Sequence, residues 1–261
     1  MKSTKILMLG ALASMFSLTA VADWTLIQDF ETATYETFDL NKRFSPQGDI
    51  YLEALDPVNP SNRFYYADPG PQVDGQNNQI WNAITLPTPV AEGAKATIKY
   101  DIFFYEVGPF NFNIGLSDVA VQLDTALTKE NGQMLVPNNY GDFESQMGLT
   151  GLGIFTVRNG NGFTNTTVQY PVGEWFTIYH VIDNGQDRTQ FYYKTAAMET
   201  PQIIALPDGT TSAIFRNGTD QDLITWIFVS AGSNAGPINV YMLDNMYIDT
   251  TGVNLDGGTP V

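Results

Sequence analysis

The sequence has 261 residues, a hydrophobic fraction of 43% and a formal net charge of −16. Nucleic acid and anionic membrane surfaces repel such an acidic chain, so we expect neither as a partner. The chain has no cysteine, which excludes thiolate zinc sites, cysteine nucleophiles and disulfide bonds. Its length and apolar content are sufficient for one large hydrophobic core.

The N-terminal segment has the pattern of a secretory signal peptide. Lys2 and Lys5 flank the start of an apolar run, Ile6–Leu18, that is too short to span a bilayer. The run is followed by Ala20-Val21-Ala22, the small-x-small pattern that signal peptidase reads. We therefore predict that residues 1–22 are cleaved and that the protein is secreted, either to the periplasm or outside the cell. An uncleaved anchor or a buried N-terminal helix is the alternative. No second long apolar run follows, so we expect no membrane insertion.

Strand signals follow along the whole mature chain. Aromatic and β-branched runs are separated by clusters of Gly, Pro, Asn and Asp, as in antiparallel β proteins. In chain order, strands are predicted at Trp24–Phe30, Ile50–Leu55, Arg63–Ala67, Ile80–Ile84, Ala94–Glu106, Asn111–Ser117, Val119–Asp124, Leu152–Arg158, Thr166–Tyr170, Glu174–Asp183, Thr189–Thr195, Gln202–Ala205, Ser212–Phe215, Leu223–Ser230 and Ile238–Ile248.

These elements predict an all-β fold. Both faces of Glu174–Asp183 are apolar, which favours a position in the middle of a sheet. Many short strands without helices indicate two stacked antiparallel sheets, either a jelly-roll sandwich or a closed barrel. No stretch resembles a flexible linker, so we expect residues 23–249 to form a single β-sandwich domain. Residues 250–261 are polar and are predicted to be a flexible tail.

Three short segments carry a family resemblance. They are Asp29-Phe30-Glu31 near the start of the mature chain, Val172-Gly-Glu-Trp175 in the middle, and Asp244-Asn245 near the end. The middle segment resembles the Gly-x-Trp strand of concanavalin A-like and laminin-G-like jelly rolls. The other two resemble the opening and closing strands of carbohydrate-binding β-sandwich modules. The resemblance implies a jelly roll that binds an extracellular polysaccharide or glycan.

The same resemblance implies a structural calcium ion. Some relatives hold calcium with one acid near the first strand and one in the last, and Glu31 and Asp244 are the matching positions. The residues also suggest a partner for Asp244, because it stands in an otherwise apolar row of Ile238–Ile248 and a buried unpaired charge is costly. Calcium shared with Glu31 or Asp29 would supply that partner. The alternatives are backbone N–H groups, an arginine, or a strand end that reaches water.

Catalytic patterns are weak in this sequence. His180 is the single histidine, and it lies in the middle of an apolar strand, so we interpret it as a core or groove-wall residue rather than a triad member. The closely spaced Glu and Asp strand motifs of jelly-roll glucanases are absent. A polysaccharide lyase could recruit His180, Tyr179 or Tyr193, and Arg158, but their spacing does not require it. We assign no catalytic residue, and the pattern favours binding over catalysis.

Aromatic and polar side chains together suggest a carbohydrate site. Sugar rings stack their C–H faces on aromatic rings, while arginine and amide groups bind the hydroxyls. The candidate binding residues are Arg63, Tyr65, Trp81, Tyr105 and Arg158. Aromatic residues also fill sandwich cores routinely, so we expect only one or two of Tyr65, Trp81 and Tyr105 to be exposed.

Three hypotheses of function follow. The leading one is a secreted glycan-binding sandwich, with calcium as a possible structural cofactor. The second is a polysaccharide lyase or glycoside hydrolase on the same fold. The third is a structural or adhesive surface protein without a sugar site. A groove with exposed aromatic rings would favour the first hypothesis, and a cleft that gathers His180 with Tyr and Arg would favour the second.

Overall fold

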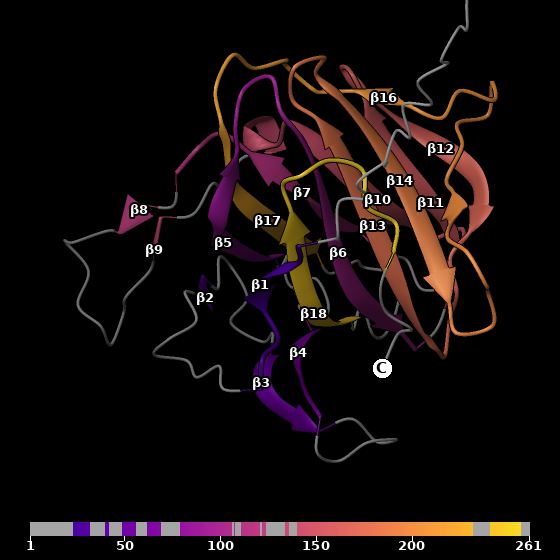
Figure 1. The fold of residues 1–261 in the computed structure, drawn as a ribbon. Helices are drawn as coiled ribbons and strands as arrows, with labels where there is room; N and C mark the ends of the chain where they lie inside the picture. Colours follow the sequence, from indigo (N-terminus) through magenta and orange to yellow (C-terminus); the bar gives the residue numbers. More distant parts are fainter. Residues whose placement is uncertain are drawn as a thin grey trace, which may run out of the picture.

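The computed structural model describes residues 23–31, 40–41, 49–55, 62–68, 79–105, 107, 111–120, 122–123, 134–135, 140–231 and 241–256. Its strands form two antiparallel sheets that pack face to face (Figure 1). We call the nine-stranded sheet "sheet A" and the seven-stranded sheet "sheet B". The predicted all-β, two-sheet sandwich is therefore confirmed. The predicted signal peptide, residues 1–22, lies outside the described residues.

Sheet A has the strand order β15-β14-β13-β6-β18-β4-β3, with β1 also paired to β18 and β16 to β14. Its strands are β1 (Thr25–Gln28), β3 (Asp49–Leu55), β4 (Arg63–Asp68), β6 (Lys95–Phe104), β13 (Trp175–Asp183), β14 (Arg188–Thr195), β15 (Gln202–Ile203), β16 (Ala213–Ile214) and β18 (Tyr241–Asp249).

Sheet B has the order β12-β11-β10-β7-β17-β5-β2. Its strands are β2 (Leu40–Asn41), β5 (Gln79–Val90), β7 (Asn111–Ser117), β10 (Ser145–Thr150), β11 (Ile154–Asn159), β12 (Gly162–Gln169) and β17 (Leu223–Ala231). A separate small pair is formed by β8 (Gln122–Leu123) and β9 (Met134–Leu135), and Tyr140–Asp142 form a single 3₁₀ turn, η1. Nowhere in the described part of the chain is there a helix of the length and apolar character that membrane crossing requires.

Strands that are distant in sequence lie side by side in both sheets. In sheet A, β18 pairs with β6, and Met242 lies opposite Phe103. In sheet B, β17 lies between β5 and β7, and Phe228 lies opposite Ile114. The chain passes repeatedly from one sheet to the other, for example between β5 and β6, β6 and β7, β12 and β13, and β17 and β18. These nested antiparallel crossovers make the sandwich a jelly roll, and the closed-barrel alternative is wrong.

The main core lies between the two sheets. On β13, Phe176, Ile178 and Ile182 are buried in it, while Trp175 belongs to an aromatic cluster on the opposite face of sheet A. This alternation is the one predicted from the sequence. Rings from the two sheets meet in the interior, as for Phe104 of β6 and Phe112 of β7, whose centroids are 5.9 Å apart. Their contact fixes which face of each strand turns inward.

A second apolar layer covers part of the outer face of sheet B. Trp81 of β5 packs there against Tyr140 and Phe143, with ring centroids 5.1 and 6.2 Å away. Ala83, Ile227 and Val229 complete this cluster. Because η1 carries Tyr140, this turn covers Trp81 on the outer face of sheet B. Tyr140 also borders the uncovered part of the same face, over β7, β10, β11 and β12.

Strand β10 is the main element that the sequence did not predict. Its sequence, Ser-Gln-Met-Gly-Leu-Thr, has few β-branched residues, and only Met147 and Leu149 belong to the core. The strand nevertheless pairs along its whole length with β7 on one side and through Met147–Leu149 with β11 on the other. Pairing on both sides supplies the stability that local propensity lacks.

A bulge in β18 changes the face that was predicted for Asp244. Asn245 has a φ of 50°, and the register between β18 and β6 shifts between Asp244 and Tyr247. As a result Met246 and Ile248 face the core, whereas Met242 lies in the aromatic cluster on the outer face of sheet A. The predicted continuous apolar row along this strand is therefore wrong, because one left-handed residue interrupts the alternation.

The predicted flexible tail is anchored over its first residues. Thr97 Oγ1 donates to Gly252 O at 2.8 Å, and the indole Nε1 of Trp24 donates to Asp256 O at 3.1 Å. Asn254 is buried, and its Nδ2 donates to Asp249 at 2.7 Å. Residues 250–256 thus form hydrogen bonds with sheet A and with the N-terminal segment.

Candidate functional site

An open pocket of about 500 Å³ lies on the outer face of sheet B. This volume is within the range of roughly 300–1,000 Å³ that is typical of ligand sites. The pocket is lined by residues of β7, β10, β11 and β12 and by three residues outside these strands, namely Asn113, Tyr140, Leu149, Thr150, Gly151, Thr156, Arg158, Phe163, Asn165 and Arg216. We call this set the sheet B pocket.

Strand alternation places the polar side chains of the pocket outward. Phe155 and Val157 of β11 are buried in the core, so Thr156 and Arg158 point to the other face. Gly148 of β10 lies between the neighbouring strands on this face. A Cβ atom there would be 2.7 Å from Asn113 Oδ1 and 3.0 Å from Thr156 Cγ2. The absence of a side chain at this position is therefore required for the close approach of β7, β10 and β11.

Arg158 is held at the end of β11. Its Nε donates to Gly160 O at 2.9 Å, and its Nη2 donates to Asn161 O at 2.9 Å. The guanidinium carbon also lies 5.1 Å from the ring centroid of Phe163 on β12. These contacts fold the side chain over the β11–β12 turn, where Gly160 takes a φ of 58°. A guanidinium has five N–H donors in total, and the two bonds to carbonyl groups use only two of them.

Arg216 faces the same pocket from the loop that follows β16. Its Nη1 donates to the backbone carbonyl of Tyr140, and its backbone N donates to Glu144 O at 2.8 Å. The Arg216 side chain is therefore hydrogen-bonded to η1, the turn that covers Trp81. The next residue, Asn217, binds the Glu144 carboxylate through its backbone N and its Nδ2, at 3.3 and 3.0 Å.

Hydrogen bonds between two distant loops bring the two arginines together. Asn159 Oδ1 accepts from Ile214 N at 3.0 Å, and Gly160 N donates to Ile214 O at 2.9 Å. The end of β11 is thus bound to β16, two residues before Arg216. Because these residues lie more than 50 positions apart, only the folded chain places the two guanidinium groups in one pocket.

The pocket has positive charge without an opposite charge in its lining. Partial burial lowers the pKa of the Arg158 guanidinium, and the positive charge of Arg216 lowers it further. Within the described ranges neither arginine forms an ion pair with a carboxylate. The Glu144 carboxylate is nearby, but it is bonded to Asn217, and burial raises its pKa. The residues that line the pocket include no Asp and no Glu.

Two aromatic residues flank the arginines. Phe163 is exposed to 43% and is available to an apolar face of a ligand. Tyr140 is half-buried against Trp81, and this burial raises the pKa of its hydroxyl. The Thr156 hydroxyl donates to Thr164 O at 3.1 Å, which leaves its oxygen as an acceptor toward the pocket. The site can therefore offer an apolar ring, guanidinium donors and hydroxyl or amide groups to one ligand.

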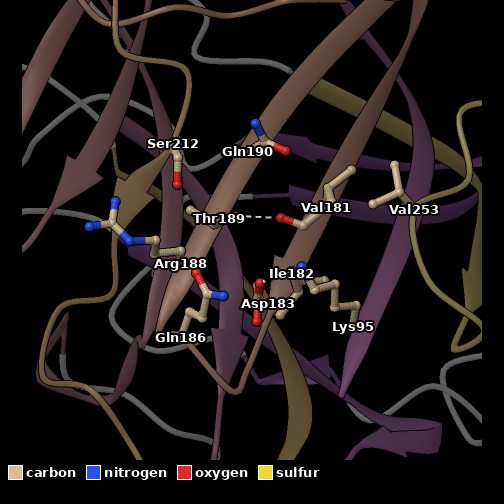
Figure 2. Close-up of a pocket in the computed structure, with 10 residues that line it drawn as sticks. All are labelled: Lys95, Val181, Ile182, Asp183, Gln186, Arg188, Thr189, Gln190, Ser212 and Val253. Carbon is tan, nitrogen blue, oxygen red and sulfur yellow. Dashed lines mark hydrogen bonds and ion pairs between the residues drawn. The ribbon is translucent and has the colours of Figure 1, made fainter. Parts of the chain in front are cut away.

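A second, smaller pocket lies on sheet A (Figure 2). Its volume is about 200 Å³, and it is lined by residues of β6, β13 and β14. Lys95 Nζ pairs with Asp183 at 2.7 Å, and Thr189 Oγ1 donates to Val181 O at 3.0 Å. In Figure 2 the Arg188 side chain extends away from the Lys95–Asp183 pair. This pocket is small, has no aromatic ring in its lining and neutralises its lysine internally, so the sheet B pocket is the stronger candidate.

Two aromatic residues of the predicted carbohydrate site are buried. Tyr65 is 0% exposed, with its ring 5.2 Å from Phe228, and Trp81 is 1% exposed beneath Tyr140. Neither ring can stack on a sugar in this structure, and both predictions are corrected. Tyr65 faces the core from β4, where its hydroxyl accepts a hydrogen bond from Asn82. Trp81 does lie on the outer face of sheet B, but the second apolar layer covers it.

The other predicted binding residues are dispersed. Tyr105 is 50% exposed and contacts Phe103 beyond the end of β6, on the side of sheet A. Arg63 is half-buried at the start of β4 and does not line the sheet B pocket. Of the five predicted residues only Arg158 lies in that pocket. The expectation that one or two of the three aromatic residues would be exposed is confirmed by Tyr105.

The charge of Glu31 acts on Asp244 near the bulge of β18. Asp244 is 0% exposed and accepts hydrogen bonds from Asn62 Nδ2 at 2.9 Å and from Asn245 N at 2.8 Å. Burial raises its pKa to about 7, and the charges of Asp101 and Glu31 add to this effect. Glu31 accepts from Arg63 N at 3.1 Å. Nowhere in the part of the chain that the structure describes do three or more His, Cys, Asp or Glu residues gather in an arrangement for a metal ion.

Arg216 is the charged residue of the pocket that sequence reasoning missed. A usable signal was present, because Arg158-Asn159-Gly160 recurs as Arg216-Asn217-Gly218. In both copies the glycine has a positive φ, 58° and 70°, so each arginine precedes a tight turn. The repeated tripeptide marks the two loops that meet at the pocket. Asn113, Phe163 and Asn165 had no comparable signal, since each is an ordinary strand residue.

No protein-family model matches the chain, and no curated protein sequence matches it either. Similarity is found among solved structures. The catalytic domain of a glycoside hydrolase family 131 protein from Coprinopsis cinerea is 9% identical, with a TM-score of 0.49 over 90% of this chain and 93% of that one. Peanut lectin is 9% identical, with a TM-score of 0.47 over 89% and 100% of the two chains. A sialidase is 12% identical with a TM-score of 0.46 over 87% of this chain, which spans only 18% of the sialidase chain. At such identities the similarity concerns the fold alone.

Proposed function

We propose that this chain is a secreted glycan-binding protein whose binding site is the sheet B pocket. The observation that carries the proposal is the combination, in one open pocket of about 500 Å³, of two guanidinium groups, amide side chains and an exposed phenyl ring. Secretion rests on the signal-peptide pattern of residues 1–22. The expected partner is an extracellular polysaccharide or glycan.

The chemistry of the lining suits a sugar. Phe163 offers a surface for the C–H face of a pyranose ring, and the neighbouring Asn165 and Arg158 offer donors for hydroxyl oxygens. Glycoside hydrolysis usually requires two carboxyl groups on either side of the bond that breaks. The lining of the sheet B pocket contains neither Asp nor Glu, which favours binding over hydrolysis at this place.

We also propose that calcium stabilises the fold at Glu31 and Asp244. The support is a buried carboxylate, Asp244, whose hydrogen bonds come from amide groups and whose pKa is raised by burial and by the charges of Asp101 and Glu31. A hard cation would neutralise this concentration of negative charge. Glu31 and Asp244 would hold the ion, and the remaining oxygen ligands would have to come from amide or backbone carbonyl groups and water.

A glycan array with the full chain tests the main proposal, together with assays for reducing ends and unsaturated products on every glycan that is retained. Retention without product supports a binding protein. Release of product would overturn the non-catalytic proposal and would indicate a lyase or hydrolase. Retention of no glycan would overturn glycan binding altogether.

Substitution of Phe163 locates the site. F163A should weaken binding of a retained glycan by roughly two- to tenfold, the loss expected for one aromatic contact. V172A is the matched control, because Val172 is exposed to 41% but lies outside the pocket. Y105A tests the competing surface beside sheet A. A loss in Y105A with normal binding in F163A would show that the glycan binds there instead.

A further inference from the structure

The presence of Arg158 and Arg216 in one pocket indicates the chemical class of the ligand. The chain has five arginines in all, and two of them line this one pocket although the molecule as a whole is strongly acidic. Two guanidinium groups that share a pocket repel each other unless an anion lies between them. Neutral sugars need no such arrangement, because amide and hydroxyl groups bind their hydroxyls without the cost of repulsion.

Both guanidinium groups are also held in place before any ligand binds. Arg158 is fixed by Gly160 O and Asn161 O, and Arg216 is fixed by the carbonyl of Tyr140. Backbone carbonyls, rather than carboxylates, hold both side chains, so the full positive charge is kept. Preorganised donors lose little side-chain entropy on binding. Guanidinium groups bind carboxylate and sulfate oxygens with charge-assisted, often bidentate, hydrogen bonds.

Three carboxylates near the Arg216 loop have hydrogen-bond partners other than the pocket arginines. The Glu144 carboxylate is bonded to Asn217, and Glu144 is only 4% exposed. Asp187 accepts a hydrogen bond from Thr219 N at 3.0 Å, and Asp118 accepts one from the Thr219 hydroxyl at 2.8 Å. These acids therefore accept hydrogen bonds from Asn217 and Thr219 rather than from the pocket arginines. The sheet B pocket thus keeps a local positive charge on an acidic molecule.

We propose that the sheet B pocket binds an anionic sugar residue, with Arg158 and Arg216 contacting its carboxylate or sulfate group and Phe163 contacting its ring. This inference rests on the proposed glycan-binding function and narrows it to acidic polysaccharides. A uronate carboxylate and a sulfate ester present the same negatively charged oxygens, so both are admitted by the chemistry.

Isothermal titration of the full chain with three probes tests the inference: oligogalacturonate, the same oligosaccharide after reduction of its carboxyl groups, and a sulfated galactan oligosaccharide. We expect at least one acidic probe to bind roughly tenfold or more tightly than the reduced probe, as charge-assisted bonds require. Preference for the first or the third probe identifies carboxylate or sulfate as the group bound. Equal binding of acidic and reduced probes would overturn the inference and leave glycan binding intact. If no probe binds and the array retains no glycan, both proposals fail.

Variants then test whether the two arginines cause the preference for the acidic probe. R158Q and R216Q should each remove most of the preference for the acidic probe, while R158K and R216K should restore part of it. R188Q is the control, because Arg188 lines the smaller pocket on sheet A. Thermal melting of every variant verifies that it is folded. If the glutamine variants do not fold, the comparison of acidic and reduced probes with the unmodified chain still decides the matter. Unchanged preference in folded R158Q and R216Q would contradict the assignment.

Discussion

The hydroxyl of Ser145 and the Nε2 atom of His180 lie 2.5 Å apart in the interior, where they connect β10 of sheet B to β13 of sheet A. Both residues are buried, and the imidazole ring lies 4.3 Å from that of Phe191. Within the described structure the Nδ1 atom has no hydrogen-bond partner, so no carboxylate orients the ring. The pair is therefore not part of a Ser-His-Asp triad, and the interpretation of His180 as a core residue is confirmed.

His180 makes stability depend on pH in a defined window. Burial lowers its pKa to about 3, compared with 6.5 for the free side chain. Below pH 6.5 the unfolded state binds a proton that the folded state does not, so stability falls as the pH is lowered toward 3. For one proton the limiting slope is about 1.4 kcal/mol per pH unit. Urea unfolding at pH 7, 6 and 5 measures how the free energy of unfolding changes with pH.

The variant H180Q separates the pH dependence of stability that is due to His180 from the pH dependence that is due to Asp and Glu residues. Gln keeps an amide near the Ser145 hydroxyl but cannot bind a proton in this range. We expect its stability to fall less steeply than that of the unmodified chain between pH 6.5 and 5. Parallel curves for the two proteins would show that His180 is not the residue responsible.

Gly115 is required by the close approach of β7 and β10. A Cβ atom at this position would overlap the backbone carbonyl of Ser145, which cannot move without breaking the sheet. G115A should therefore destabilise the protein by about 1–3 kcal/mol, the usual cost of overpacking. The control is G162A, because a Cβ atom at Gly162 would meet nothing within 4 Å. Equal unfolding free energies for the two variants would contradict this packing.

Trp81 should behave as a core residue rather than as a binding residue. W81A removes a buried ring that contacts Tyr140 and Phe143, so we expect a loss of about 3–5 kcal/mol in the free energy of unfolding. W81F should lose less, because it keeps an aromatic ring in the layer. W24A is the comparison, since Trp24 lies half-buried at the surface beneath Lys99. A stable W81A variant with impaired glycan binding would instead restore Trp81 to the binding site.

Calcium should stabilise the chain through Asp244 and Glu31. At a concentration about 100 times the dissociation constant, a ligand of the folded state adds ~2.7 kcal/mol of stability. We expect calcium to raise the melting temperature, EDTA to reverse the rise, and D244N and E31Q to abolish it. The exposed Glu174 offers a control in E174Q, which should respond to calcium as the unmodified chain does. Identical melting in calcium and EDTA would eliminate the metal.

Much of the fold could be predicted from local pattern, and the exceptions have physical causes. The alternation on β13 was predicted correctly because a strand with both faces apolar can lie only in the middle of a sheet. Strand β10 was missed because its stability comes from pairing with β7 and β11 rather than from its own residues. The face of Asp244 was assigned wrongly because the left-handed Asn245 shifts the alternation.

By itself the sequence determined the all-β class, the two-sheet arrangement and one residue of the pocket, Arg158, because side-chain alternation and turn residues are local properties. Only the tertiary structure decided which aromatic rings are exposed, since the burial of Tyr65 and Trp81 depends on elements distant in the chain. It alone also placed Arg216 beside Arg158, through hydrogen bonds between Ile214 and the β11 turn. A binding pocket is a relation between distant segments, and no local pattern encodes their distance.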